Sequence, residues 1–150
     1  MPTKIERARP EDVDEVLRLL AEHHSPPDGL HEHVGTMLVA RDDGRIIGSA
    51  ALEIYPDGAL LRSVAVAPTL QRQRLGRELT EAAIRLAQEC RVPAIYLLTT
   101  TAADYFSKFG FERFTRADVP ATVQSSVEFT SACPSSATVM RKRLEPSTPT

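Results

Sequence analysis

One stretch of the chain, Leu60 to Cys90, constrains the fold more than any other. It opens with an apolar run that ends at Val66 and is closed by Pro68. Such a run is typical of a buried strand, because branched side chains fit a pleated sheet and proline ends a ladder. After a polar loop, apolar residues return at spacings of three and four, which predicts a helix; they are Leu75, Leu79, Ala82, Ala83, Leu86 and Ala87. The stretch therefore predicts a strand, a short basic loop and a long helix.

The loop in front of this helix predicts an anion site. The first turn of a helix leaves backbone N–H groups without partners, and the helix dipole favours negative charge there. Arg72 and Arg74 oppose that dipole, which a purely structural turn tends to avoid, and Gly76 lets the backbone approach a ligand closely. A phosphate or pyrophosphate is the favoured ligand, and a solvated basic turn is the alternative.

Strands and helices are predicted on both sides of this stretch. Before it we expect strands at 3–8, 37–40 and 46–55 and a helix from Pro10 whose apolar face carries Val13, Val16, Leu17, Leu20 and Ala21. After it we expect strands at 92–98, 111–114 and 137–144, a helix ending at Gly110, and a small helix with Val123 and Val127 on one face. A strand, a crossover helix and a second strand predict a parallel pair. The fold class is α/β (α+β): a mixed, mostly antiparallel sheet of six or seven strands with helices on both faces.

Size and composition predict one domain over residues 1–145 and a disordered tail at 146–150. With 42% hydrophobic residues and a net charge of −2, nothing favours nucleic acid or an acidic membrane as partner, and the basic residues are local. The N-terminus shows no apolar leader, and Cys90 and Cys133 are the two cysteines. We therefore expect a cytoplasmic protein whose cysteines are free thiols buried as small hydrophobes.

Two blocks of residues resemble the GNAT superfamily of N-acetyltransferases. Gln71-Arg72-Gln73-Arg74-Leu75-Gly76, after a Val-Ala-Val strand, is similar to the acetyl-CoA pyrophosphate loop, with Arg74 where a glycine is usual. Tyr105-Phe106-Ser107-Lys108-Phe109-Gly110-Phe111 is similar to the superfamily's helix ending in Lys-x-Gly-Phe. The resemblance covers nearly the whole chain. With the ending Cys133-Pro134-x-Ser136-Ala137, the chain looks most like the short N-acetyltransferases of arsenic-resistance operons and the acetyltransferase domain of N-acetylglutamate synthases.

This resemblance implies acetyl-CoA as co-substrate. The backbone edge of the central strand would pair with the pantetheine arm as an added strand. The loop and the start of the helix would hold the pyrophosphate. The implied cofactor-binding residues are Val64, Ala65, Val66, Gln71, Arg72, Gln73, Arg74, Leu75, Gly76, Arg77 and Phe106.

Acetyl transfer to an amine needs a neutral amine, a donor for the oxyanion and a proton for the leaving thiolate. Tyr105 is the candidate acid, although many GNAT enzymes carry their tyrosine at the next position, which is Phe106 here. A core aromatic with its hydroxyl at the surface is the alternative for Tyr105. Glu53 is the candidate base, with a solvent-facing strand carboxylate as its alternative. His33 is the second candidate base, since an imidazole titrates near neutral pH.

Arg62 is a charged residue within an apolar strand, so it needs a partner or a cleft. One interpretation is a salt bridge to a neighbouring carboxylate such as Glu53. The other, which we favour because the resembled families act on amino acids, is a bidentate clamp on a substrate carboxylate. Ser136 matches a substrate-contacting serine of N-acetylglutamate synthases, but the arginine two places before it is Pro134 here, which speaks against glutamate itself. Arg62, His33 and Ser136 form the predicted substrate-binding set.

Together with these patterns, the resemblance implies an acetyl-CoA-dependent N-acetyltransferase acting on the primary amine of a small, amino-acid-like, carboxylate-bearing molecule. Transfer would be direct in a ternary complex, because no cysteine is placed for an acyl-enzyme. An acyl-CoA-binding regulatory module with little or no turnover is the alternative. No metal site is predicted, because the histidines lack helical i, i+4 spacing and have no cysteine beside them. The resemblance also suggests a homodimer.

Overall fold

The computed structural model describes residues 4–22, 35–42, 44–66, 75–99, 102–124 and 137–144, with the backbone alone for Glu22, Ser63 and Val66. Its strands are β1 (Lys4–Arg7), β2 (Met37–Asp42), β3 (Arg45–Tyr55), β4 (Gly58–Val66), β5 (Ala94–Thr99), β6 (Glu112–Arg113) and β7 (Thr138–Arg143). Its helices are α1 (Val13–Glu22), α2 (Leu75–Glu89), α3 (Ala103–Ser107) and α4 (Ala121–Gln124), with 3₁₀ turns η1 (Pro10–Asp12) and η4 (Arg116–Asp118).

The described strands form one seven-stranded sheet in the order β1-β2-β3-β4-β5-β7-β6. Strands β2, β3 and β4 are an antiparallel meander, and Gly44 supplies the positive φ of 83° in the first turn. The pair β4–β5 is parallel, and every other neighbouring pair is antiparallel. The predicted fold class is therefore confirmed, including the parallel pair on either side of α2.

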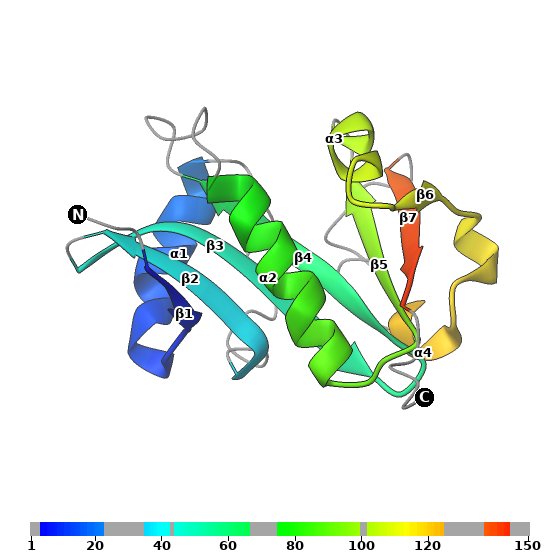
Figure 1. Cartoon of the computed structure of the whole chain (residues 1–150), viewed down its shortest axis with the longest axis horizontal. Coiled ribbons are helices and arrows are strands. Elements are labelled where there is room, and N and C mark those ends of the chain that lie inside the picture. Colours follow the sequence, from blue (N-terminus) through cyan, green and yellow to red (C-terminus); the bar gives the residue numbers. More distant parts are fainter. Residues whose placement is uncertain are drawn as a thin grey trace, which may run out of the picture.

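The parallel pair is short. Its ladder consists of Ala59 with Ile95 and Leu60 with Tyr96. Beyond these residues β4 continues to Val66 and β5 to Thr99, and Figure 1 shows the two strands diverging in the direction of α3. The sheet is thus split between its two central strands, and the backbone edges that face the split carry hydrogen-bonding groups.

Helices cover both faces of the sheet. Alternate residues of one strand point to opposite faces: in β2, Leu38 and Ala40 pack with α2, whereas Met37 and Val39 pack with α1. The small helix α4 lies on the face opposite α2, where Val123 packs against Leu60 and Tyr96. Figure 1 shows α2 crossing in front of β2 to β4 with α1 behind them.

Close contact between α2 and the sheet depends on Gly48 in β3. A Cβ at this position would lie 2.7 Å from Leu79 Cδ1, 3.2 Å from the Ala65 carbonyl oxygen and 3.4 Å from Leu75 Cδ2. Leu75 and Leu79 are both buried. Gly48 thus lets the first turns of α2 lie directly on β3.

Three sequence predictions are corrected. In α1, Leu19 is buried and Ala21 is exposed, so the apolar face is rotated toward Leu19 relative to the predicted stripe. Helix α3 ends at Ser107 rather than at Gly110; Gly110, with φ of 91°, instead closes the tight turn that follows. Cys90 is a free thiol as expected, but it is exposed rather than buried.

Some predictions fall on residues outside the described ranges: the tail at 146–150, Val127, Cys133 and the histidines. Over the described ranges, none of the helices combines the length and the apolar character needed to cross a bilayer.

Candidate functional site

The start of α2 lies where the predicted anion site should be. Leu75 is buried against Gly48 and anchors the first turn, while Gly76 is half-buried and Arg77 is exposed. In β4, Ala65 is buried and Val64 half-buried, and Ala65 and Val66 pair with Ser49 and Gly48 of β3. On the edge of β4 that faces β5, Val64 to Val66 lie beyond Leu60, the last residue of β4 that pairs with β5. The remaining loop residues of the prediction, Gln71, Arg72, Gln73 and Arg74, lie outside the described residues.

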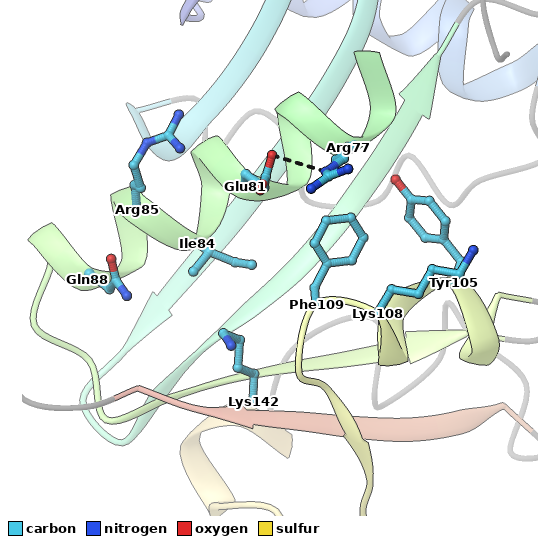
Figure 2. A pocket seen from close by; sticks show the side chains of 9 residues that line it. All are labelled: Arg77, Glu81, Ile84, Arg85, Gln88, Tyr105, Lys108, Phe109 and Lys142. Atoms are coloured by element: carbon cyan, nitrogen blue, oxygen red, sulfur yellow. Dashed lines mark ion pairs between the residues drawn. The ribbon is translucent and has the colours of Figure 1, made fainter. Parts of the chain in front are cut away.

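A pocket of about 670 Å³ lies between α2, α3 and β7. Figure 2 shows that its walls come from the outer side of α2, from α3 and the turn after it, and from β7. The lining residues are Arg77, Glu81, Ile84, Arg85, Gln88, Tyr105, Lys108, Phe109 and Lys142. Four of these side chains are cationic and one is anionic, and Arg77 and Glu81 are 3.7 Å apart. The pocket therefore favours an anionic ligand with an apolar part, which Ile84 and Phe109 can contact.

Tyr105 and Phe106 point in different directions, as neighbouring helical residues do. Phe106 is buried, and its ring lies edge-on to Phe111 with centroids 5.9 Å apart. Tyr105 is half-buried, contacts Phe109 at 5.3 Å between ring centroids, and lies in the pocket wall on the side of Arg77 (Figure 2). The structure thus brings Tyr105 and Arg77 to one pocket and places Phe106 in the core.

Glu53 and Arg62 form a buried ion pair on β3 and β4. Arg62 Nη1 donates to Glu53 Oε2 over 2.7 Å, and the two side chains are 0% and 2% exposed. The Tyr55 hydroxyl donates to the other carboxylate oxygen of Glu53. Glu53 is therefore not the solvent-facing carboxylate of the alternative interpretation, and the salt bridge considered for Arg62 is present. Glu53 and Arg62 are brought together, as that interpretation anticipated.

The two predicted catalytic residues are not brought together. Glu53 is opposite Leu60 in the ladder, and Leu60 packs with α4. Tyr105 packs against the core that α2 covers. Glu53 and Tyr105 therefore lie on opposite faces of the sheet. They also belong to opposite sides of the split, because Glu53 is on β3 and Tyr105 is on α3, which follows β5.

Sequence reasoning missed several residues of these two sites. Tyr55 could have been found, because a residue two places after Glu53 in a strand shares its face. Lys108, Arg85 and Lys142 carry no local pattern that predicts a pocket, since their meeting depends on the sheet order. Two predicted substrate residues, His33 and Ser136, lie outside the described ranges. Over those same ranges no group of three potential metal ligands occurs.

The comparison with known families gives a match over more than half of the chain. A family profile described as Acetyltransferase (GNAT) domain matches residues 33–113. A curated amino-acid acetyltransferase from Actinobacillus pleuropneumoniae serotype 3 (strain JL03) is 31% identical over 93 residues, which are 61% of this chain and 21% of that protein. The chain therefore spans about a fifth of the length of the curated relatives it matches.

Solved structures share the fold. N-acetylglutamate synthase from Neisseria gonorrhoeae, complexed with coenzyme A and N-acetyl-glutamate, superposes with a TM-score of 0.82 at 21% identity over 97% of this chain and 36% of that chain. Rv2747 from Mycobacterium tuberculosis, in complex with CoA, superposes with a TM-score of 0.80 at 21% identity over 95% of this chain and 99% of that chain.

Proposed function

This chain belongs to the GNAT acetyltransferase family, and from that premise we propose that it transfers an acetyl group from acetyl-CoA to the primary amine of a small, carboxylate-bearing acceptor. The observation that carries the proposal is the split between β4 and β5 at the start of α2. An extended pantetheine arm can add to the exposed edge of β4 as a further strand. That placement puts a thioester where the two strands separate.

The first turn of α2 and the basic pocket support acetyl-CoA as the co-substrate. Backbone N–H groups at Gly76 and Arg77 lie at a helix N-terminus, where a diphosphate binds favourably. The pocket beside them offers Arg77 and Lys108 for charge and Phe109 for apolar contact. The loop at 71–74 completes this site in the proposal. Phe106 is buried in the core, and its contact with the co-substrate remains a prediction.

The transfer step follows from the chemistry of a thioester. The amine nitrogen of the acceptor attacks the thioester carbonyl carbon, an N–C bond forms and the C–S bond breaks. The products are an N-acetylated acceptor and coenzyme A, whose sulfur takes up the proton that the amine gives up. Tyr105 and Glu53 remain our predicted acid and base. Glu53 is buried, so a role as base would require water to reach one of its carboxylate oxygens.

The acceptor class rests on Arg62 and on the relatives. A guanidinium is suited to hold a carboxylate in two parallel hydrogen bonds. Arg62 lies two residues beyond Leu60, the last residue of β4 that pairs with β5. The curated relatives are amino-acid acetyltransferases, and the Neisseria gonorrhoeae structure holds N-acetyl-glutamate. We therefore propose an amino acid or an amino-acid-like acid as acceptor, with His33 and Ser136 as further contacts. A role in arsenic resistance and a cytoplasmic location also remain predictions.

A thiol-release assay with acetyl-CoA and a panel of amino acids and amino-acid-like toxins tests the proposal. We expect thiol release that depends on the acceptor, and binding of acetyl-CoA by calorimetric titration. An absence of binding at millimolar acetyl-CoA would overturn the proposal. Binding without turnover for any acceptor would favour the second candidate, a regulatory acyl-CoA-binding module. The feature that speaks for this candidate is Phe106, which has no hydroxyl at the position where many GNAT enzymes carry a tyrosine.

A further inference from the structure

Two cationic side chains of the basic pocket, Arg85 and Lys142, have no role in the proposed diphosphate site. Arg77 and Lys108 lie toward the start of α2, whereas Arg85 and Lys142 lie toward the end of this helix (Figure 2). Among the described residues, neither Arg85 nor Lys142 forms an ion pair. The pocket therefore has a second cationic end, for which a diphosphate at the first turn of α2 does not account.

Lys142 occupies a core-facing position of β7. Alternate residues of a strand share a face, and the neighbours of Lys142 on its face, Met140 and Leu144, are 2% and 7% exposed and belong to the core that α2 covers. Lys142 itself is half-buried, and Figure 2 shows its amino group pointing from β7 toward α2. An ammonium drawn away from water without a counter-charge is unfavourable. A lysine at this position therefore favours an anionic ligand in the pocket.

The turn after α3 leaves space for this amino group. Lys142 Nζ lies beside Gly110, where an added Cβ would be 2.7 Å from the nitrogen. The φ of Gly110 is 91°, a conformation that residues with a side chain rarely adopt. A side chain at position 110 would compete with the amino group for this space. Gly110 thus serves the pocket as well as the turn.

The spacing along α2 suits a ligand with two anionic groups. Arg85 follows Gly76 by nine residues, which is about 14 Å along the helix axis. Helical side chains lean toward the N-terminus of their helix, so the guanidinium of Arg85 is carried back toward the first turn and shortens this distance. A ribose that carries phosphate groups at two positions can bridge what is left. The pocket volume of about 670 Å³ also lies within the range of small-ligand sites, about 300–1,000 Å³.

We propose that Lys142, together with Arg85, binds the 3′-phosphate of coenzyme A and makes the enzyme selective for acetyl-CoA over thioesters that lack this phosphate. The inference rests on the proposed acetyl transfer and deepens it, because it names the part of the co-substrate that the second cationic end recognises. Phe109 lies between the two cationic ends and offers an apolar surface to the adenine (Figure 2). Thioesters of dephospho-coenzyme A or of pantetheine phosphate would leave Lys142 without its anion.

Calorimetric titration of the wild type and of Lys142→Met with acetyl-CoA and with acetyl-3′-dephospho-CoA tests this inference. Methionine keeps an unbranched apolar stem in place and removes the charge. We expect the wild type to bind acetyl-CoA about tenfold more tightly than the dephospho thioester at low salt, and Lys142→Met to raise the Kd for acetyl-CoA about fivefold. The Kd for the dephospho thioester should be the same in both proteins, which also shows that the variant is folded.

Arg143→Met is the matched control. It removes one positive charge from the next position of the same strand, but this exposed side chain belongs to the opposite face of β7. Both Kd values should therefore stay at their wild-type levels. Arg85→Met should raise the Kd for acetyl-CoA alone, by a smaller factor of about two, because Arg85 is exposed and its charge is screened.

Three results would count against the 3′-phosphate site and leave the transferase proposal intact. They are equal binding of the two thioesters by the wild type, a loss in Lys142→Met that is the same for both thioesters, and a loss in Arg143→Met as large as that in Lys142→Met. A wild type that binds neither thioester at millimolar concentration overturns the transferase proposal, and this inference with it.

Discussion

Arg62 and Glu53 meet at 2.7 Å with both side chains withdrawn from solvent. Two opposite charges in such a place stabilise each other, but each also loses its hydration. Replacing one partner leaves an uncompensated charge buried, whereas replacing both leaves no buried charge at all.

We therefore expect Arg62→Met alone to lower the free energy of unfolding by about 3–5 kcal/mol. The double variant Arg62→Met with Glu53→Leu should recover most of that loss, because an apolar pair of similar volume replaces the ion pair. Urea unfolding of the two variants and the wild type measures both values. Additive losses in the double variant would contradict the prediction and indicate that other contacts of these residues dominate.

The sheet and its two helix-covered faces could be predicted because each strand carries its own pattern. The apolar run before Pro68 and the helical spacing of Leu75, Leu79 and Ala83 are local features, and both correspond to observed elements. The pairing of Arg62 with Glu53 is one of two interpretations, because the hairpin register brings the two residues close but does not show whether the guanidinium also faces a cleft. Strand alternation alone could not decide between a salt bridge and an open clamp.

The pocket could not be predicted for a related reason. Lys142 reaches it because β7 inserts between β5 and β6, a sheet order that depends on the whole fold. Lys142 Nζ lies over Gly110, where an added Cβ would be 2.7 Å from it. The sequence pattern predicts that a helix ends at Gly110. Gly110 does have a positive φ, but the helix ends earlier, at Ser107.

Gly48→Ala should destabilise the protein and disturb the start of α2. The new methyl group would approach Leu79 Cδ1 to 2.7 Å and the Ala65 carbonyl oxygen to 3.2 Å, and the backbone oxygen cannot move away easily. We expect a loss of about 1–3 kcal/mol in the free energy of unfolding, as for other overpacked cores. Because α2 would shift, the Kd for acetyl-CoA should also rise.

Gly35→Ala is the matched control for this change. Among the described residues, no atom lies within 4 Å of a Cβ built at Gly35, so the same methyl group clashes with none of them. Urea unfolding should place this variant within about 0.5 kcal/mol of the wild type, and calorimetric titration should give the same Kd. Equal stability in the two variants would show that α2 does not depend on close contact at Gly48.

Asp12 should contribute to stability in a pH-dependent way. Burial by itself would raise the pKa of the Asp12 carboxyl, but hydrogen bonds from the Arg9 backbone N–H and from the Arg41 guanidinium outweigh it and lower the pKa. A carboxyl whose pKa is lower in the folded state stabilises that state above the unfolded pKa of about 4. The contribution is lost as the pH falls below that value, through the folded pKa.

Asp12→Asn should therefore lower the free energy of unfolding by about 1–2 kcal/mol at pH 7. Near pH 3 the difference from the wild type should be smaller, because the wild-type carboxyl is then losing the same contribution. Urea unfolding at both pH values measures it, with Asp14→Asn, an exposed carboxylate of the same helix start, as control. A difference that grows toward pH 3 would have the wrong sign and would exclude this origin.

Arg77 and Lys108 should strengthen acetyl-CoA binding through charge. Both line the pocket beside the start of α2, and the carboxylate of Glu81, 3.7 Å from Arg77, offsets part of the positive charge there. Arg77→Ala and Lys108→Ala should each raise the Kd by about fivefold at low salt, and Glu81→Gln should lower it slightly. The effects should shrink as salt is added, because exposed charges are screened.

Calorimetric titration at two salt concentrations checks this, with Arg113→Ala on the exposed edge strand β6 as a control for net charge. If Arg113→Ala raised the Kd as much as Arg77→Ala, the effect would come from the overall charge of the protein, and the pocket would have no part in holding the co-substrate.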